Sequence, residues 1–512
     1  LENKGEYINK TEDGLLDIIN QKSWVSPRND LGFKNYNGIE YSVELTTALY
    51  AHTISQTLYL LGDKLSPHIR KLAVESVYKR CFEPVLYKIN TQNNHPESKF
   101  LVMTNNYNHV CLSGVVGAAL TLIDDKRERA VFACIGEYYS QNGLAGFGDD
   151  GYCSEGVGYF NYGFGNFVVL GESLRRATGG KINLFDNPKV RKIAAYPVKL
   201  ETINNVYPAI ADSQIGASPN PNIMFYVNKI YQMGIPEYEA VDWEGKTNDI
   251  VTNIMMAFPD AVSAIGNESS RSGNEDKLRS FFEQSAVLVV RPSTGESSLG
   301  AAIKGGNNAE NHNHNDVGSY TVVSGDENIA GDQGSIPYTK DIFDPKYRYT
   351  YKTVGSYGHP VPLVAGKQQT PGAQAKATVL NRRFSDEEDV FTLDLRPAYD
   401  VPSLTKLERT MIYSRKGAGK VSFEDNFAFS QPENFETVVV TRADCKKISD
   451  DRILLEGKTQ KIEVLMTSPG NKLSIREEKI SEGGTPYTRI GIYIDKPLKE
   501  GKIILTYIPV RN

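Results

Sequence analysis

The stretch NHNHNDVG, residues 311–318, sets the organisation of this 512-residue chain. Its first six positions hold two of the seven histidines, three amides and one carboxylate. Such a run is buried only if its members are paired, because each unpaired buried polar group costs about 1–3 kcal/mol. The residues that follow, VGSYTVV (317–323), have the composition of a strand. We therefore expect the polar side chains to converge on one point at the start of a strand.

Two later segments add further metal-ligating side chains. Asp332 lies in the Gly-flanked turn 331–334, after a second strand-like run, and His359, the last histidine, lies in SYGHP (356–360). Imidazole and carboxylate groups on three β-segments suit a borderline divalent metal such as zinc. Only one of the paired histidines need be a ligand, which leaves the other available for acid–base chemistry. A solvated surface loop is the alternative interpretation of the histidine-rich run.

Composition and charge describe an ordinary globular protein. Hydrophobic residues make up 40% of the chain and charged residues 23%. A net charge of −5 gives no reason to expect nucleic acid or an anionic membrane as a partner. No apolar run is long enough to span a bilayer. The five cysteines have no CxxC spacing, so neither a disulfide framework nor a metal knuckle is expected.

The first half of the chain has the periodicity of helices. Apolar residues three and four apart predict helices over 69–88, 112–124, 125–141, 188–204, 220–233 and 248–258, and another after the Gly-rich segment 148–163 that ends near 177. Pro84 is expected to break or kink the first of these helices. The polar cluster 104–111 is expected to lead into the second. Stacked helical hairpins with functional loops at one end suggest an α/α toroid.

Beyond a polar, loop-like stretch at 267–277 the periodicity changes to two. Strands are predicted at 286–290, 299–303, 390–395, 438–440, 462–465 and 503–507. Many short strands without helices indicate an antiparallel β-sandwich. We therefore divide the chain into a helical domain, 1–278, and a sandwich domain, 279–512, that carries the histidine-rich stretch.

Five motifs resemble those of the heparinase II/III-like polysaccharide lyases. They are NNYNHVCLSG (105–114), DDGYCSEGVGYFNYG (149–163), NHNHNDVGSY (311–320), GDQGSIPYT (331–339) and SYGHPVPLVAG (356–366). The resemblance implies an N-terminal α/α toroid and a C-terminal β-sandwich. It also implies a cleft that cleaves uronic-acid polysaccharides, such as glycosaminoglycans, by β-elimination to unsaturated products. Tyr107 departs from the family, which usually carries Trp at that position.

The chemistry of β-elimination explains the residue types. The uronate carboxylate must be neutralised before the C5 proton becomes acidic, and an amide or a protonated imidazole donates the required hydrogen bond. Asn106 is the first choice for this donor, with Asn108 and His109 behind it. A tyrosine is expected to act as base and acid on one face of the sugar. The resemblance suggests Tyr159, whereas the spacing along a helix leaves Tyr162 equally open.

The resemblance also divides the roles of the histidines. His312 becomes the candidate second base, and His314, Asp332 and His359 become the metal set. The metal is expected to be zinc in a structural role, because a closed site would fix the loop that carries His312. The expected partner is an anionic uronic-acid polysaccharide. A periplasmic or secreted location is implied, with the signal peptide absent from this sequence.

Two other functions fit parts of the sequence. A glycoside hydrolase on the same toroid would use Asp149, Asp150 or Glu155 as paired carboxylates, but it leaves the histidine-rich stretch unexplained. A glycan-binding sandwich with a helical spacer leaves the clustered asparagines and tyrosines without a role. In a lyase, Glu155 is expected to orient a neighbour by accepting a hydrogen bond. A new C4–C5 double bond in the product separates the three functions.

Overall fold

The computed structural model describes residues 4–91, 96–241, 255–257, 277–293, 298–339 and 341–510. The chain divides into two compact units, each discontinuous in sequence. The helical unit comprises Leu1–Phe147, Tyr159–Arg191 and Asn220–Asn267, and the sheet unit comprises Gly148–Gly158, Lys192–Pro219 and Glu268–Asn512. Two segments that precede the strands in sequence therefore pack with the strands. The division of the chain at 278/279 stays a prediction.

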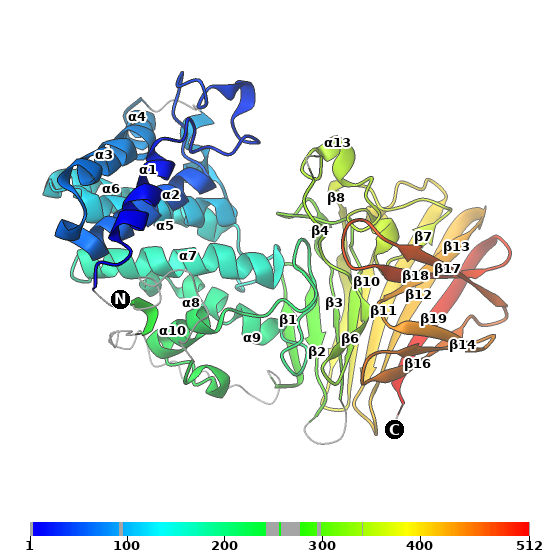
Figure 1. Ribbon diagram of the computed structural model, residues 1–512. Helices are drawn as coiled ribbons and strands as arrows, with labels where there is room; N and C mark the ends of the chain where they lie inside the picture. Colours follow the sequence, from blue (N-terminus) through cyan, green and yellow to red (C-terminus); the bar gives the residue numbers. More distant parts are fainter. Residues whose placement is uncertain are drawn as a thin grey trace. The chain divides into compact units, whose positions relative to one another are not determined.

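Helices fill the first part of the chain, as their periodicity predicted (Figure 1). The longer described α-helices are α1 (Ile8–Ile19), α2 (Leu45–Leu61), α3 (Pro67–Val77), α4 (Glu83–Thr91), α5 (Asn106–Leu122), α6 (Lys126–Ala145), α7 (Gly156–Ala177) and α10 (Pro221–Tyr231). The region predicted as one helix over 188–204 is divided into α8 (Pro188–Ala194) and α9 (Tyr196–Leu200), followed by a tight turn closed by a bridge between Ile203 and Val206. Of the predicted helix 248–258, only residues 255–257 are described. Of the predicted loop 267–277, only residue 277 is described.

Helix α5 begins earlier than the sequence suggested, and this correction concerns the candidate site. The Asn105 side chain accepts a hydrogen bond from the backbone N–H of Tyr107, so it caps a helix that starts at Asn106. Most of the polar cluster 104–111 therefore lies inside the first turns of α5 rather than in a loop before it.

The helix predicted over 69–88 is interrupted just before Pro84, as the proline predicted. Between α3 and α4 the chain forms a π-helical turn, Tyr78–Phe82, and the backbone N–H of Glu83 donates to the carbonyl of Tyr78. Helix α4 begins at Glu83, so Pro84 falls in a first turn, where its missing N–H and fixed φ are tolerated.

The sheet unit is built from antiparallel pairs. A five-stranded sheet has the order β1-β2-β3-β5-β6, with β1 Arg279–Phe282, β2 Val287–Val290, β3 Leu299–Ile303, β5 Tyr320–Ser324 and β6 Glu327–Gly331. An eight-stranded sheet has the order β14-β15-β16-β19-β12-β11-β10-β9, with β9 Thr378–Phe384, β10 Glu388–Asp394, β11 Leu404–Ser414, β12 Lys420–Glu433, β14 Asp444–Ser449, β15 Arg452–Glu456, β16 Lys461–Thr467 and β19 Leu498–Pro509. Smaller sheets contain β17 (Leu473–Ile480), β18 (Tyr487–Ile494), β13 (Phe435–Thr441) and β7 (Leu363–Val364), and the pair β4 (Asn307–Asn308) and β8 (Gly372–Lys376).

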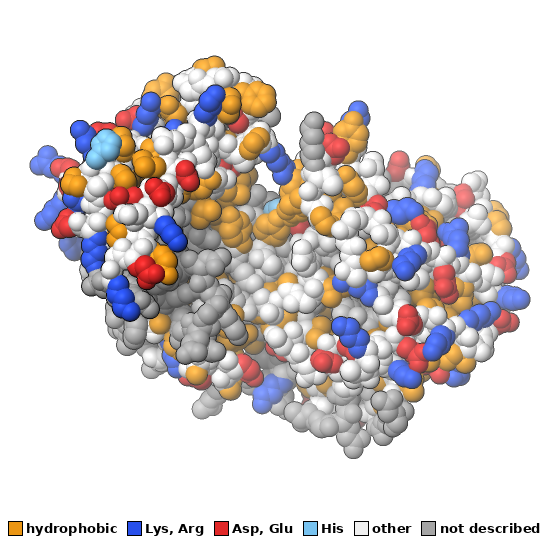
Figure 2. All heavy atoms as spheres, in the orientation of Figure 1, with side chains coloured by type: hydrophobic (Ala, Val, Ile, Leu, Met, Phe, Trp, Pro, Cys, Tyr) orange, Lys and Arg blue, Asp and Glu red, His pale blue; other side chains and the backbone are white. Residues whose placement is uncertain are grey.

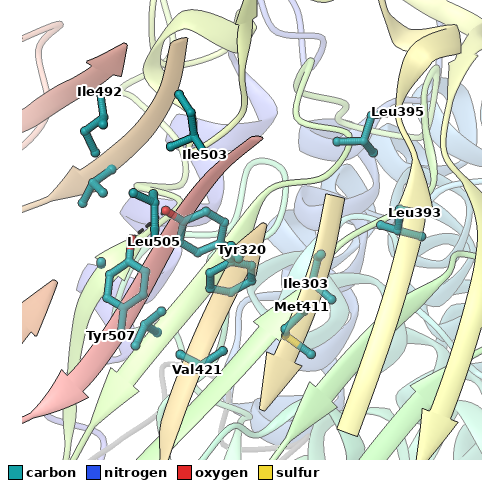
Figure 3. Close-up of a cluster of buried hydrophobic side chains, with 14 of the residues drawn as sticks. Ile303, Tyr320, Leu393, Leu395, Met411, Val421, Ile492, Ile503, Leu505 and Tyr507 are labelled. Atoms are coloured by element: carbon teal, nitrogen blue, oxygen red, sulfur yellow. Dashed lines mark hydrogen bonds between the residues drawn. The ribbon is translucent and has the colours of Figure 1, made fainter. Parts of the chain in front are cut away.

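The core of the sheet unit lies between these sheets. Strands β10 and β12 alternate buried and partly exposed residues, as expected for a sheet with one covered face, whereas β2, β3 and β5 are buried throughout. Figure 3 shows Tyr320 and Tyr507 turned toward each other in this core, with their hydroxyl oxygens 2.6 Å apart. The Tyr320 ring stacks on Phe423 at a centroid distance of 3.8 Å. A helical region followed by an antiparallel sandwich is therefore the fold that the sequence predicted.

The segments 148–158 and 192–219 belong to the sheet unit because they cover its five-stranded sheet. The ring of Tyr152 lies 5.1 Å from that of Phe282 on β1, and the ring of Tyr196 lies 5.8 Å from it. The Tyr196 hydroxyl donates to the carbonyl of Cys153 at 3.0 Å. These contacts hold the two segments against strand β1.

The surface and the cysteines agree with the composition. On the face shown in Figure 2, basic and acidic side chains of the sheet unit are interspersed, without an extended region of one sign. No helix within the described part of the chain is long and apolar enough to cross a membrane. All five cysteines are free thiols: Cys81, Cys111 and Cys153 are buried, Cys134 on α6 is exposed and Cys445 on β14 is partly covered.

Candidate active site

The first turn of α5 presents Asn106 to helix α7. Asn106 is 9% exposed. A Cβ atom placed on Gly163 of α7 would lie 2.9 Å from the Asn106 Cβ, closer than such atoms approach in proteins. Glycine at position 163 therefore lets the two helices touch at Asn106, one residue beyond Tyr162.

Asn108 and His109 have structural environments. Asn108 is fully buried, and its amide nitrogen donates to the carbonyls of Phe100, Leu101 and Tyr139 at 2.9–3.1 Å. Burial lowers the pKa of His109 to about 4, so the ring is neutral at pH 7 and is no cationic donor. Its Nε2 lies 3.1 Å from the carbonyl oxygen of Ser140. Asn106 therefore remains the better-placed amide of this motif.

Tyr159 and Tyr162 lie inside α7, which begins at Gly156, and not in a Gly-rich loop before the helix as the sequence suggested. Tyr159 is partly buried, whereas Tyr162 is 41% exposed. Burial, with the nearby Cys111 and Glu44, raises the pKa of Tyr162 to about 12. The Tyr162 phenol thus keeps its proton at neutral pH, which disfavours it as the base.

In the sheet unit, the histidine-rich loop is buried and clamped at both ends by one lysine. Lys304, at the end of β3, forms ion pairs with Asp316 and with Glu310, the latter at 3.6 Å. All three side chains are nearly inaccessible to solvent. Burial would lower the pKa of Lys304, but the two carboxylates outweigh it and raise that pKa. The loop 310–316 therefore starts and ends on the same buried cation.

His314, Asp332 and His359 converge, as the sequence predicted. One ligand atom from each lies within 4.8 Å of the others, and all three residues are buried. Among the described residues, His314 Nδ1 and His359 Nε2 have no hydrogen-bond partner, and His359 Nδ1 lies 3.1 Å from Asp332 Oδ2. Buried, unpaired imidazole nitrogens around a carboxylate are what a metal ion satisfies, so the residues fit a divalent cation.

A carboxylate that the sequence analysis missed joins the two histidines of the loop. Asp212 Oδ2 lies 2.8 Å from His312 Nδ1, and Asp212 Oδ1 lies 2.9 Å from His314 Nε2. Arg348 donates to the same carboxylate at 3.2 and 3.3 Å, and Tyr338 does so at 3.1 Å. Burial would raise the pKa of Asp212, but the hydrogen bonds from the histidines and the charges nearby outweigh it and hold that pKa far below its usual range.

His312 is held in an unusual backbone conformation beside Asp212. Its φ of 54° is in the left-handed region, which few residues other than glycine adopt. Arg348 also donates to the carbonyl oxygens of His312 and Asn313, each at 2.9 Å. The other ring nitrogen of His312, Nε2, lies 3.9 Å from Glu155 Oε2.

Asp149 and Asp150, two of the carboxylates that a glycoside hydrolase would use, accept hydrogen bonds from other parts of the sheet unit. Asp149 and Asp150 accept hydrogen bonds from the side chain and backbone of Gln284, and Asp150 also accepts one from the Tyr152 backbone. These contacts tie the Gly-rich loop to the turn after β1. Glu155 is buried, and its Oε2 lies 3.9 Å from His312 Nε2, so its orienting role stays a prediction.

An open pocket in the helical unit is lined by aromatic rings, together with Lys22 and Asp30. It has a volume of about 970 Å³ and is lined by Trp24, Phe33, Tyr36 and Tyr50, among others. Asn29 donates to the hydroxyl of Tyr107 at 3.4 Å and to Glu44 at 3.0 Å, so this loop also touches α5 beside Asn106.

Comparison with known proteins finds similarity in structure alone. No protein-family model and no curated protein matches the sequence. The whole chain superimposes on a mutant of the heparan sulfate lyase HepC from Pedobacter heparinus, with a TM-score of 0.65, 13% identity and 74% of that chain covered. A heparinase III structure gives a TM-score of 0.67 at 11% identity, with 99% of this chain and 75% of that chain covered.

A further heparinase III structure gives a TM-score of 0.60 at 14% identity, with 91% of this chain and 69% of that chain covered. The protein therefore has the fold of these lyases along nearly its whole length. This result confirms the fold class expected from the motifs, a helical toroid followed by an antiparallel sandwich.

The clamp on the histidine-rich loop predicts a large loss of stability for Lys304→Met. The substitution leaves Glu310 and Asp316 buried without their cation, which costs about 3–5 kcal/mol. Lys416→Met is the matched control, because Lys416 pairs with Glu387 at the surface, where both side chains are 72% exposed and such pairs contribute about 0–1 kcal/mol. Denaturant unfolding of both variants measures the difference, and equal shifts would refute the clamp.

The burial of His109 predicts a pH dependence of stability. Its pKa is about 4 in the folded chain and about 6.5 when unfolded, so the unfolded chain binds the extra proton between these values. Stability is therefore complete above pH 6.5 and falls by about 3 kcal/mol as the pH drops to 4. In His109→Gln this component of the pH dependence should disappear. Unfolding free energies of the wild type and of His109→Gln, measured across pH 4–7, test this prediction. The same pH dependence in both proteins would contradict it.

Proposed function

We propose that the protein is a polysaccharide lyase that cleaves a uronic-acid-containing, glycosaminoglycan-like polysaccharide by β-elimination and releases unsaturated uronosyl products. The proposal rests mainly on one observation. A chain with the fold of heparan sulfate and heparinase III lyases buries a histidine-rich loop whose two imidazoles share the Asp212 carboxylate. Neither a hydrolase nor a binding module needs such an arrangement.

The helical unit is proposed to supply the neutralising donor and the proton carrier. Asn106 donates its amide N–H to the substrate carboxylate, so that negative charge developing at C5 is stabilised. Tyr159, as the phenolate, accepts the C5 proton and, as the resulting phenol, donates it to the leaving O4 oxygen, so the residue ends the cycle as the phenolate in which it began. Tyr162, whose pKa burial raises to about 12, is the alternative phenol. Asn108 is left out because its amide is committed to three backbone carbonyls.

The sheet unit is proposed to supply His312 as a second base for the opposite face of the sugar. His314, Asp332 and His359 would hold zinc, a metal that accepts two imidazoles and a carboxylate. Bound there, the ion would cross-link three β-segments and keep the loop that carries His312 in place. Since the substrates of such lyases are extracellular polymers, we place the protein in the periplasm or outside the cell.

The decisive assay measures the product of the reaction. The purified protein is incubated with heparan sulfate, heparin, chondroitin sulfate, hyaluronan and alginate, and ultraviolet absorbance follows the conjugated C4–C5 double bond. Absorbance should rise with at least one of these polymers. New reducing ends without absorbance would identify a hydrolase that uses Asp149, Asp150 or Glu155. Binding without either product would identify a glycan-binding protein.

The two tyrosines of α7 give a matched pair of variants. Tyr159→Phe removes only the phenolic oxygen, and it should lower kcat by about 100-fold or more while the fold and KM stay near those of the wild type. Tyr162→Phe, three residues along the same helix, should keep most activity. The reverse result would move the role to Tyr162, and full activity in both variants would exclude a tyrosine mechanism.

The histidines of the loop predict opposite effects on metal content. His314→Ala should lose stoichiometric zinc and lower the melting temperature, because it deletes a ligand. His312→Ala should retain metal and melting temperature but lose turnover. Elemental analysis and thermal unfolding of the two purified variants and the wild type make this comparison. No metal in the wild type after any preparation would refute the site.

A further inference from the structure

The carboxylate of Asp212 contacts both histidines of the loop. Asp212 is 6% exposed and lies in the segment 192–219, roughly one hundred residues before the histidines in sequence. Its two oxygens are divided between the rings: Oδ2 meets His312 and Oδ1 meets His314. This side chain lies outside the five motifs of the sequence analysis.

The ionic form of the carboxylate fixes which nitrogen of each ring carries a proton. An ionised carboxylate only accepts hydrogen bonds, so His312 must present Nδ1–H and His314 must present Nε2–H. The lone pair of His314 is then on Nδ1, for which the described residues provide no hydrogen-bond partner. The lone pair of His312 is on Nε2, the atom on the side of Glu155.

The backbone around Asp212 is built to keep it there. Ala211, the preceding residue, is buried and has φ of 52°, a conformation that costs energy for a residue with a side chain. Ser213, the following residue, accepts a hydrogen bond from the Gly158 backbone through its Oγ and one from Ser335 through its carbonyl. With His312 also at positive φ, strained residues lie on both sides of the contact.

We propose that Asp212 is the positioning residue that sets the tautomers of His312 and His314 together, so that one carboxylate prepares both a base and a metal ligand. The role of His312 as a base rests on the proposed function, but the tautomers and the metal affinity do not. An amide cannot replace this carboxylate, because asparagine offers one acceptor oxygen and one donor nitrogen. In Asp212→Asn, the ring that meets the NH₂ group must move its proton to the other nitrogen or lose the contact.

The first test needs no variant and no substrate. Nitrogen-15 NMR of the histidine rings in metal-free wild-type protein, at a pH where they are neutral, should show His312 as the Nδ1–H tautomer and His314 as the Nε2–H tautomer. His312→Ala and His314→Ala spectra identify the signals. The opposite tautomer at either ring would overturn the proposal, whatever reaction the protein catalyses.

The second test compares Asp212→Asn with a matched buried carboxylate. Residues that hydrogen-bond to metal-bound histidines typically change metal affinity by about 10–100-fold. In Asp212→Asn, zinc affinity, measured by competition with a chromophoric chelator, should therefore fall by that factor, or the His312 tautomer should switch. Turnover should fall through kcat with KM retained. Asp389→Asn is the control, because Asp389 is equally buried but binds Arg279 and Arg415, and it should change stability without changing zinc affinity or either tautomer.

The outcomes separate this proposal from the proposed function. Wild-type zinc affinity together with unchanged tautomers in Asp212→Asn would refute the positioning role even if the lyase assay succeeds. A changed tautomer or weakened zinc binding in a protein that cleaves no uronan would support Asp212 and refute the lyase.

Discussion

The cost of removing polar groups from water governs the sheet unit around residues 310–316. Two histidines, several amides and two carboxylates lie in its interior, and each would destabilise the fold if left unpaired. Lys304 neutralises both ends of the loop, and Asp212 accepts from both imidazoles. Arg348 binds Asp212 and two loop carbonyls at once. The unpaired nitrogens of His314 and His359 are the part of this network that a metal ion would complete.

The sequence predicted the elements whose signal is local. Strands such as β3 and β19 follow from runs of apolar and β-branched residues, and their register follows from the side that must be buried. The ligand set His314, Asp332 and His359 was also predictable, because each member lies in a short motif next to a strand. The start of α5 was missed because polar residues inside a first turn resemble a loop until the capping role of Asn105 is known.

Partners from distant parts of the chain were not predictable. Asp212 follows an unremarkable apolar run, AIA, and Arg348 lies between two tyrosines, so neither has a local pattern that marks a site. Lys304 is a single charge at the end of a strand. The role of Asp212 arises only when segments about one hundred residues apart come together, and hydrophobic periodicity contains no information about such pairing. Lys304 pairs with carboxylates much closer in sequence, but nothing in the local pattern shows that all three side chains are enclosed together. The membership of 148–158 and 192–219 in the sheet unit is hidden for the same reason.

The distribution of thiols makes the helical unit selectively addressable. Three cysteines are sealed in the interior, and burial together with Glu477 raises the pKa of Cys445 to about 12, so little reactive thiolate forms there at neutral pH. Cys134 on α6 is the exposed thiol. A maleimide dye or spin label should therefore attach to α6 of the natural sequence, without engineered cysteines. Such a probe would report on the helical unit while zinc is added to or withdrawn from the sheet unit.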